Sequence, residues 1–76
     1  MRYLIIIEKA KNNLSAYIPD IPGCITTGDT EEEIIENMQE ALTGHLELMQ
    51  QDGDSIPEPV STSGYIEVNL PVSHKS

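Results

Sequence analysis

Few side chains in this sequence have the type and spacing that covalent or metal chemistry needs. Histidine occurs only at positions 45 and 74, and cysteine only at position 24. His45 falls within the apolar positions of a predicted helix, so we expect it to pack against the sheet or a neighbouring subunit. Cys24 follows a turn at the start of a predicted strand, which favours a small buried side chain over a nucleophile. No histidine or cysteine pair has helical ligand spacing, and we expect no metal or cofactor.

Three carboxylates at predicted strand ends suggest one catalytic alternative. Glu8, Asp20 and Asp29 could converge on magnesium, as the acidic groups of metal-dependent nucleases do. They are three of 13 acidic residues, and the sequence does not place them near one another. We therefore favour a protein that is not an enzyme, and keep a small magnesium-dependent nuclease as an alternative.

A second set of acids lies along one side of the predicted helix. Glu36, Glu40 and Glu47 fall within a narrow arc of the helical wheel, and no lysine or arginine occurs in the helix to balance them. Like charges four residues apart repel, and a basic partner would turn that repulsion into attraction. A solvated surface would also account for the pattern. Together with Asp20, these glutamates are our candidate partner-binding residues.

Hydrophobic alternation predicts a small sheet. Apolar and polar residues alternate in short β-branched runs that are bounded by polar turns or by proline and glycine. The strands are expected over residues 3–8, 14–18, 24–27 and 65–70. The first two form a hairpin through the polar turn KAKNN over residues 9–13, and Pro22-Gly23 has the composition of a turn that needs a positive φ at glycine.

One long helix has the strongest local signal in the chain. Thr30 and Glu33 form a capping box, and three glutamates in the first turn suit the positive end of the helix dipole. Apolar residues then recur at spacings of three and four until Gly53, a plausible C-terminal cap. The order β-β-β-α-β predicts an α+β fold, in which this helix covers one face of a small, mostly antiparallel sheet.

Length and charge restrict the class of protein. The chain has 76 residues and a net charge of −9, which argues against direct binding of nucleic acid and favours a basic partner. A domain of this size, without a possible internal disulfide, needs self-association for stability, so we expect a homodimer or homotetramer. The apolar run over residues 4–7 is too short for a signal peptide or a membrane span, so we expect a cytoplasmic protein that does not bind membranes.

The stretch YIPDIPGCITTGDTEEEIIENMQEAL resembles the signature of the HicB-like antitoxins. A Pro-Asp-x-Pro-Gly-Cys turn ends a strand, and Gly-Asp-Thr then opens a helix with Glu-x-x-x-Asn and Glu-Ala. The matching residues are Pro19, Asp20, Pro22, Gly23, Cys24, Gly28, Asp29, Thr30, Glu33, Asn37, Glu40 and Ala41. The resemblance extends to IPEP at residues 56–59, and we expect one HicB-like domain over residues 1–71 with a frayed tail over 72–76. Most of the motif is expected to be structural.

This resemblance implies a binding module with a partial, catalytically inactive ribonuclease-H-like fold. Such proteins neutralise HicA, a small basic toxin that cleaves messenger RNA, by covering its active surface. Typical members continue into a C-terminal DNA-binding domain, and this chain ends at Ser76, so we do not extend operator binding to it. A solitary oligomeric HicB-like module without a toxin partner is the alternative.

Overall fold

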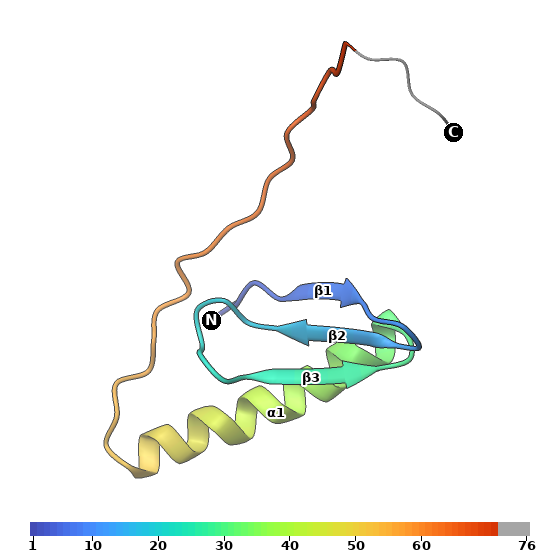
Figure 1. Cartoon of the computed structure of the whole chain (residues 1–76). Coiled ribbons are helices and arrows are strands. Elements are labelled where there is room, and N and C mark those ends of the chain that lie inside the picture. Colours follow the sequence, from blue (N-terminus) through green and yellow to red (C-terminus); the bar gives the residue numbers. More distant parts are fainter. Residues whose placement is uncertain (72–76) are drawn as a thin grey trace.

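The computed structural model describes residues 1–71, which form a three-stranded sheet with one helix on one face (Figure 1). The elements follow the order β1 (Ile6–Lys9), β2 (Leu14–Tyr17), β3 (Ile25–Gly28) and α1 (Glu31–Gln51). The sheet is antiparallel with the strand order β1-β2-β3. This arrangement confirms the predicted α+β class and its β-β-β-α core.

The strand register explains which residues face the helix. Ile7, Ala16 and Thr26 lie opposite one another across the three strands, as do Ile6, Tyr17 and Ile25 in the next row. Ala16 is buried on the helix side, whereas Tyr17 and Ile25 are exposed. Because successive side chains of a strand point to opposite faces, the first row faces α1 and the second row faces away from it.

A small apolar core lies between the sheet and the helix. Its buried members are Ala16, Ile18, Ile21, Cys24, Ile34 and Met38. Partly buried residues of β1, β2 and α1 pack around this core. The helix contacts mainly β3 and β2, so β1 is the strand that it covers least. The helix and the sheet approach each other closely at Gly28 of β3, where an added Cβ would lie 3.0 Å from three atoms of Ile34.

The Pro/Gly-rich connection between β2 and β3 is tightly turned. The Ile21 amide donates to the Ile18 carbonyl, and the Cys24 amide donates to the Ile21 carbonyl. Gly23 has a φ of +84°, as the sequence predicts for this turn. Pro19 and Pro22 are exposed on the outside of the same connection. The structural role of Pro19 and Pro22 stays a prediction.

Both helix ends are capped by local sequence. The Thr30 hydroxyl accepts from the Glu33 amide at 3.1 Å, while the Glu33 carboxylate accepts from the Asp29 amide at 2.8 Å. The glutamate thus bonds one residue earlier than an ordinary capping box would require. At the other end the Gly53 amide donates to the Gln50 carbonyl and the Asp54 amide to the Met49 carbonyl, which is a Schellman motif.

The predicted fourth strand over residues 65–70 is wrong for the single chain. These residues have no regular secondary structure, and the segment runs away from the sheet (Figure 1). The Cα radius of gyration is 16.3 Å, against about 11 Å for a compact chain of this length. A strand needs a neighbour for its backbone groups, and the chain leaves the domain before this segment begins. The expected frayed tail over 72–76 lies outside the described residues.

The first three strands are also shorter or shifted relative to the prediction. β1 begins three residues later than expected, and β3 runs from Ile25 instead of Cys24. α1 is the only helix of the described residues, and it is not long and apolar enough to cross a membrane.

Candidate partner-binding surface

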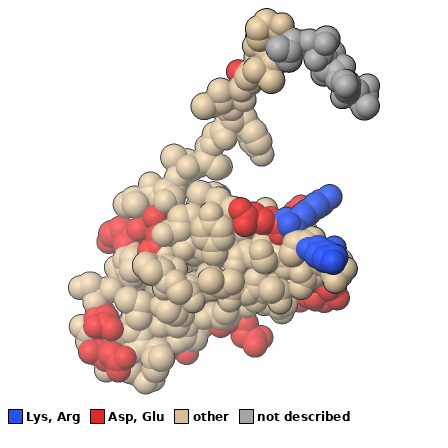
Figure 2. Space-filling model, in the orientation of Figure 1, with Lys and Arg blue, Asp and Glu red and all other residues tan. Residues whose placement is uncertain are grey.

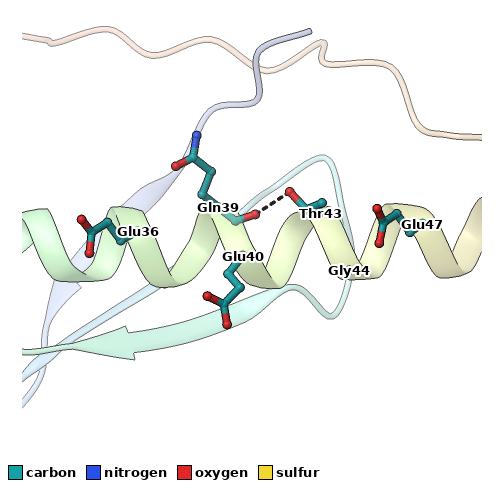
Figure 3. Close-up of a pocket in the computed structure, with 6 residues that line it drawn as sticks. All are labelled: Glu36, Gln39, Glu40, Thr43, Gly44 and Glu47. Atoms are coloured by element: carbon teal, nitrogen blue, oxygen red, sulfur yellow. Dashed lines mark hydrogen bonds between the residues drawn. The ribbon is translucent and has the colours of Figure 1, made fainter.

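The three helix glutamates that the sequence singles out line one shallow hollow on the solvent side of α1 (Figure 3). We call this hollow the helix depression. Its lining consists of Glu36, Gln39, Glu40, Thr43, Gly44 and Glu47. All six residues are exposed, and the carboxylates of the three glutamates extend away from the helix axis (Figure 3). The depression is therefore a shallow, open acidic surface.

Gly44 adds no side chain to the lining of the depression. A Cβ added to Gly44 would meet no atom within 4 Å. The Thr43 hydroxyl donates to the Gln39 carbonyl at 2.7 Å, which holds that side chain against the helix backbone. Gly44 thus leaves open space between Glu40 and Glu47, where part of another molecule could approach the backbone.

Gln39, Thr43 and Gly44 were not identified as surface residues from sequence. The signal that could have found them is helical spacing, because positions 36, 39, 40, 43, 44 and 47 fall on successive turns of one face. Only the charged members of that face stand out by residue type.

Charge is unevenly distributed over the molecule. α1 contains six glutamates, and its last turn has no basic residue. The basic residues of the described part of the chain are Arg2, Lys9 and Lys11, and the two lysines belong to the β1–β2 hairpin. Figure 2 shows the visible basic side chains at one end of the molecule, with acidic side chains both beside them and over the rest of the visible surface. A basic partner would be attracted to the helix side and away from the hairpin.

Asp20 has a structural role in the chain and does not line the helix depression. Its carboxylate accepts hydrogen bonds from the Val60 amide at 3.0 Å, the Ser61 amide at 3.0 Å and the Ser61 hydroxyl at 2.7 Å. The Ser61 backbone bond, followed by the Ser61 hydroxyl bond, lowers the pKa of Asp20, because these donors favour the charged carboxylate. This residue therefore attaches the segment after α1 to the β2–β3 connection. Its role as a partner contact stays a prediction.

The residues of the nuclease alternative do not form a metal site. Asp20 bonds Val60 and Ser61, Glu8 lies on β1, and Asp29 directly precedes the helix cap. Over residues 1–71 there is no group of three or more histidine, cysteine, aspartate or glutamate side chains that could hold a metal ion. The magnesium-dependent nuclease therefore has no geometric support from Glu8, Asp20 and Asp29.

Cys24 is a buried part of the core, as predicted. Its sulfur lies 3.6 Å from the Met38 sulfur, and burial raises the pKa of the Cys24 thiol. A thiol with a raised pKa is a weak nucleophile at neutral pH. His45 is partly buried on α1, at the edge of the helix face that packs on the sheet.

The geometry can be compared with known proteins. Residues 3–69 match the family described as the HicB-like antitoxin of bacterial toxin-antitoxin systems. The chain belongs to this family. Among its relatives, "Antitoxin HicB 2" of Photorhabdus laumondii is 37% identical over 73 residues, which are 96% of this chain and 52% of that protein. An uncharacterized 14.9 kDa protein of Haemophilus phage HP1 is 38% identical over 66 residues, covering 87% of this chain and 50% of the phage protein.

This HicB-like chain also resembles a solved structure. A chain of a HicA3 and HicB3 toxin-antitoxin complex has a TM-score of 0.68 and 35% identity, and the match covers 79% of this chain and 70% of that chain. By contrast, the HicB-like chain spans about half the length of the first two curated relatives. The shared part thus comprises the fold described above, and the activity and partners of the longer relatives remain to be proposed for this chain.

Proposed function

We propose that this HicB-like protein neutralises a small basic toxin of the HicA type by covering the surface with which that toxin binds and cleaves messenger RNA. The observation that carries the proposal is the 35% identity and shared fold with a chain from a HicA3 and HicB3 complex. Family membership over residues 3–69 supports the same role.

The charge of the molecule supports a basic partner. A protein that binds RNA presents positive charge to the phosphates, and an acidic protein can occupy the same surface. The net charge of −9 and the all-acidic charge of α1 provide that complementarity. The helix depression adds a shallow contact area that Glu36, Glu40 and Glu47 line, with open space at Gly44.

The first experiment is a neutralisation assay in a test host. A small basic protein encoded beside this chain is expressed alone and together with it, while growth and messenger RNA integrity are followed. We expect growth arrest and RNA cleavage from the neighbour alone, and recovery of both with this chain. If no neighbour is toxic, or if co-expression gives no protection, toxin neutralisation is rejected and the solitary oligomeric binding module becomes the better description.

A charge-reversal pair tests the surface itself. The double variant Glu36→Lys/Glu40→Lys changes the net charge by +4 within the helix depression. The double variant Asp54→Lys/Glu58→Lys makes the same change at two exposed positions after the helix. We expect the first pair to weaken toxin binding and rescue far more than the second. Equal losses would mean that only net charge matters, and no loss would mean that the helix face is simply solvated.

A further inference from the structure

The outer edge of β3 presents backbone hydrogen-bonding groups that the described chain does not fill. The Ile18 amide donates to the Cys24 carbonyl, so the backbone groups of Ile25 and Thr27 point away from β2. Within residues 1–71, the one bond to these groups comes from the Asn37 side-chain amide, which donates to the Thr27 carbonyl at 2.9 Å. The Thr27 amide and both groups of Ile25 remain open. An unpaired edge of this kind is a template for another strand.

The side chains at this edge are apolar on the face that points away from α1. Ile25 is 67% exposed and belongs to a cross-strand row with Ile6 and Tyr17. Tyr17 has a neighbour on both sides in that row, whereas Ile25 has one only on the β2 side. An apolar residue of an added strand would therefore continue the row and cover surface that the single chain exposes.

The helix-facing side of the same edge lies along α1. The strand and the helix run in opposite directions (Figure 1), and Thr27 of β3 is bonded to Asn37 of α1. From Thr27 back to Ile25 the strand covers about 7 Å, which equals about four to five residues of a helix. The open groups of Ile25 therefore lie level with the helix turn over residues 40–44.

This helix turn combines negative charge with free space. Glu40, Ala41 and Gly44 follow Asn37 at helical spacing and share its side of α1. All three are exposed, and a Cβ added to Gly44 would meet no atom within 4 Å. The helix contains no lysine or arginine that could neutralise the Glu40 carboxylate. A long basic side chain that points from the β3 edge toward α1 would therefore find both room and an opposite charge.

We propose that an extended segment of the basic partner adds to the outer edge of β3 as a fourth strand. Successive side chains of a strand point to opposite faces, so this segment alternates basic residues, which face α1, with apolar residues, which lie beside Ile25. Its backbone bonds the Thr27 amide and the open groups of Ile25, and its charges pair with the acidic side of α1. This inference rests on the proposed function, because it specifies which part of a toxin-type partner the chain binds.

A basic segment fits this site better than the described part of the chain itself. Residues 61–63 line a hollow together with residues 2–5, so the segment after α1 leaves on the β1 side of the sheet. The charged residues of that segment over 56–70 are Glu58 and Glu67, which the acidic side of α1 would repel. The net charge of −9 likewise disfavours a second copy at this edge.

A peptide titration tests the edge without any toxin. The probe is a short capped peptide in which lysine alternates with valine, and NMR follows the amides of the full chain. We expect saturable shifts at Ile25, Thr27 and Asn37, with slower exchange of the Thr27 amide. The control peptide has the same residues with a methyl group on every amide nitrogen, so it keeps the charge and cannot donate backbone hydrogen bonds.

We expect the methylated peptide to have a dissociation constant about fivefold higher or more, because the backbone bonds are lost. A second control places the lysines and the valines in two separate blocks and should also bind more weakly. No binding of the alternating peptide overturns the proposal. Equal binding of the methylated peptide, or shifts confined to α1, overturns it as well, because charge alone would then attract the peptide.

Thr27→Pro tests the same edge from the side of the protein. Proline removes the outward Thr27 amide but no bond to β2, and edge strands tolerate proline at such positions. Ser63→Pro is the control, because it removes an exposed amide away from β3. We expect Thr27→Pro to raise the dissociation constant of the alternating peptide about fivefold or more and Ser63→Pro to change it less than about twofold. Circular dichroism checks the helix content of both variants, and if Thr27→Pro does not fold, the methylated peptide decides.

Titration calorimetry with the toxin identified in the neutralisation assay separates this inference from the proposed function. Weaker toxin binding by Thr27→Pro than by Ser63→Pro supports both. Equal binding by the unchanged chain and the two variants leaves the proposed function standing and overturns the strand addition. If the unchanged chain neutralises no neighbouring protein, the proposed function is rejected, and the partner segment inferred here is rejected with it.

Discussion

At the scale of single residues, two positions have the clearest structural consequences. Gly28 allows α1 to pack closely on β3, and Asp20 binds the segment that follows α1. Gly28 lets β3 approach the first turn of α1 to ordinary packing distance, with Ile34 fully buried beside it. Asp20 bonds two amides and a hydroxyl some 40 residues further along the sequence. Neither role is visible in the residue type, because each depends on what lies opposite in the folded chain.

Gly28→Ala should destabilise the domain. The added methyl would lie 3.0 Å from the backbone of Ile34, so strand and helix must separate, at a cost of about 1–3 kcal/mol in the free energy of unfolding. The matched control is Gly44→Ala, where the added methyl meets nothing and should stabilise the helix by up to about 1 kcal/mol. Urea unfolding followed by circular dichroism measures both. A Gly28→Ala variant as stable as the unchanged chain would contradict the close approach.

The attachment of the segment after α1 to the β2–β3 connection should weaken at acid pH. The pKa of Asp20 is lowered from its ordinary 3.8 by the Ser61 and Val60 bonds. The attachment is therefore fully present above pH 3.8, and it is lost as the pH falls through the lower folded-state pKa.

Asp20→Ala should release the same segment at neutral pH, with faster amide exchange at Val60 and Ser61 and little change within α1. Asp54→Ala is the control, because it removes an exposed carboxylate that follows the helix. Unchanged exchange at Val60 and Ser61 in Asp20→Ala would show that other contacts hold the segment.

At the scale of elements, α1 combines two properties that oppose each other. Its buried side supplies Ile34 and Met38 to the core, whereas its outer side carries like charges four residues apart at Glu36 and Glu40. This repulsion costs the free domain a few tenths of a kcal/mol. The proposed basic partner would turn this repulsion into attraction on binding.

Glu40→Lys should therefore change stability and binding in opposite directions. The lysine stands four residues after Glu36 in the favourable orientation, which should raise the free energy of unfolding by about 0.3–0.5 kcal/mol. The same change places a positive charge in the helix depression and should weaken toxin binding. Thermal unfolding and titration calorimetry measure the two effects. Binding that is unchanged in a stabilised variant would remove Glu40 from the contact surface.

At the scale of the whole molecule, the net charge of −9 should govern association with a basic toxin. Exposed charges are screened over about 8 Å at physiological ionic strength, and over shorter distances as salt is added. We expect the association rate to fall steeply with salt and the dissociation rate to change much less. Stopped-flow mixing at several salt concentrations measures both rates. An association rate independent of salt would show that steering by charge is absent.

Local features of the sequence were enough to predict the central part of the fold. The Thr30 and Glu33 cap, the apolar spacing along α1 and the Gly53 terminus depend on residues within one or two turns, so the helix bounds could be read closely. The β1–β2 hairpin also depends on neighbours in sequence. The acidic stripe followed from helical geometry alone, and the family signature followed from closely spaced turn and cap residues.

Only the tertiary structure decided the features that depend on residues far apart in the sequence, namely the pairing of residues 65–70 and the hydrogen bonds of Asp20. Alternation at residues 65–70 predicts a strand, but pairing needs an edge within reach, and beyond its contacts with Tyr3 and Asp20 the chain runs away from its own sheet. Asp20 looked like a free surface acid because its donors lie 40 and 41 residues later. Sequence alone determined the presence of the helix and of the three strands before it, and the acidic charge along the helix. Which polar groups remain free, and which edge remains open, was decided by contacts between residues far apart in the chain.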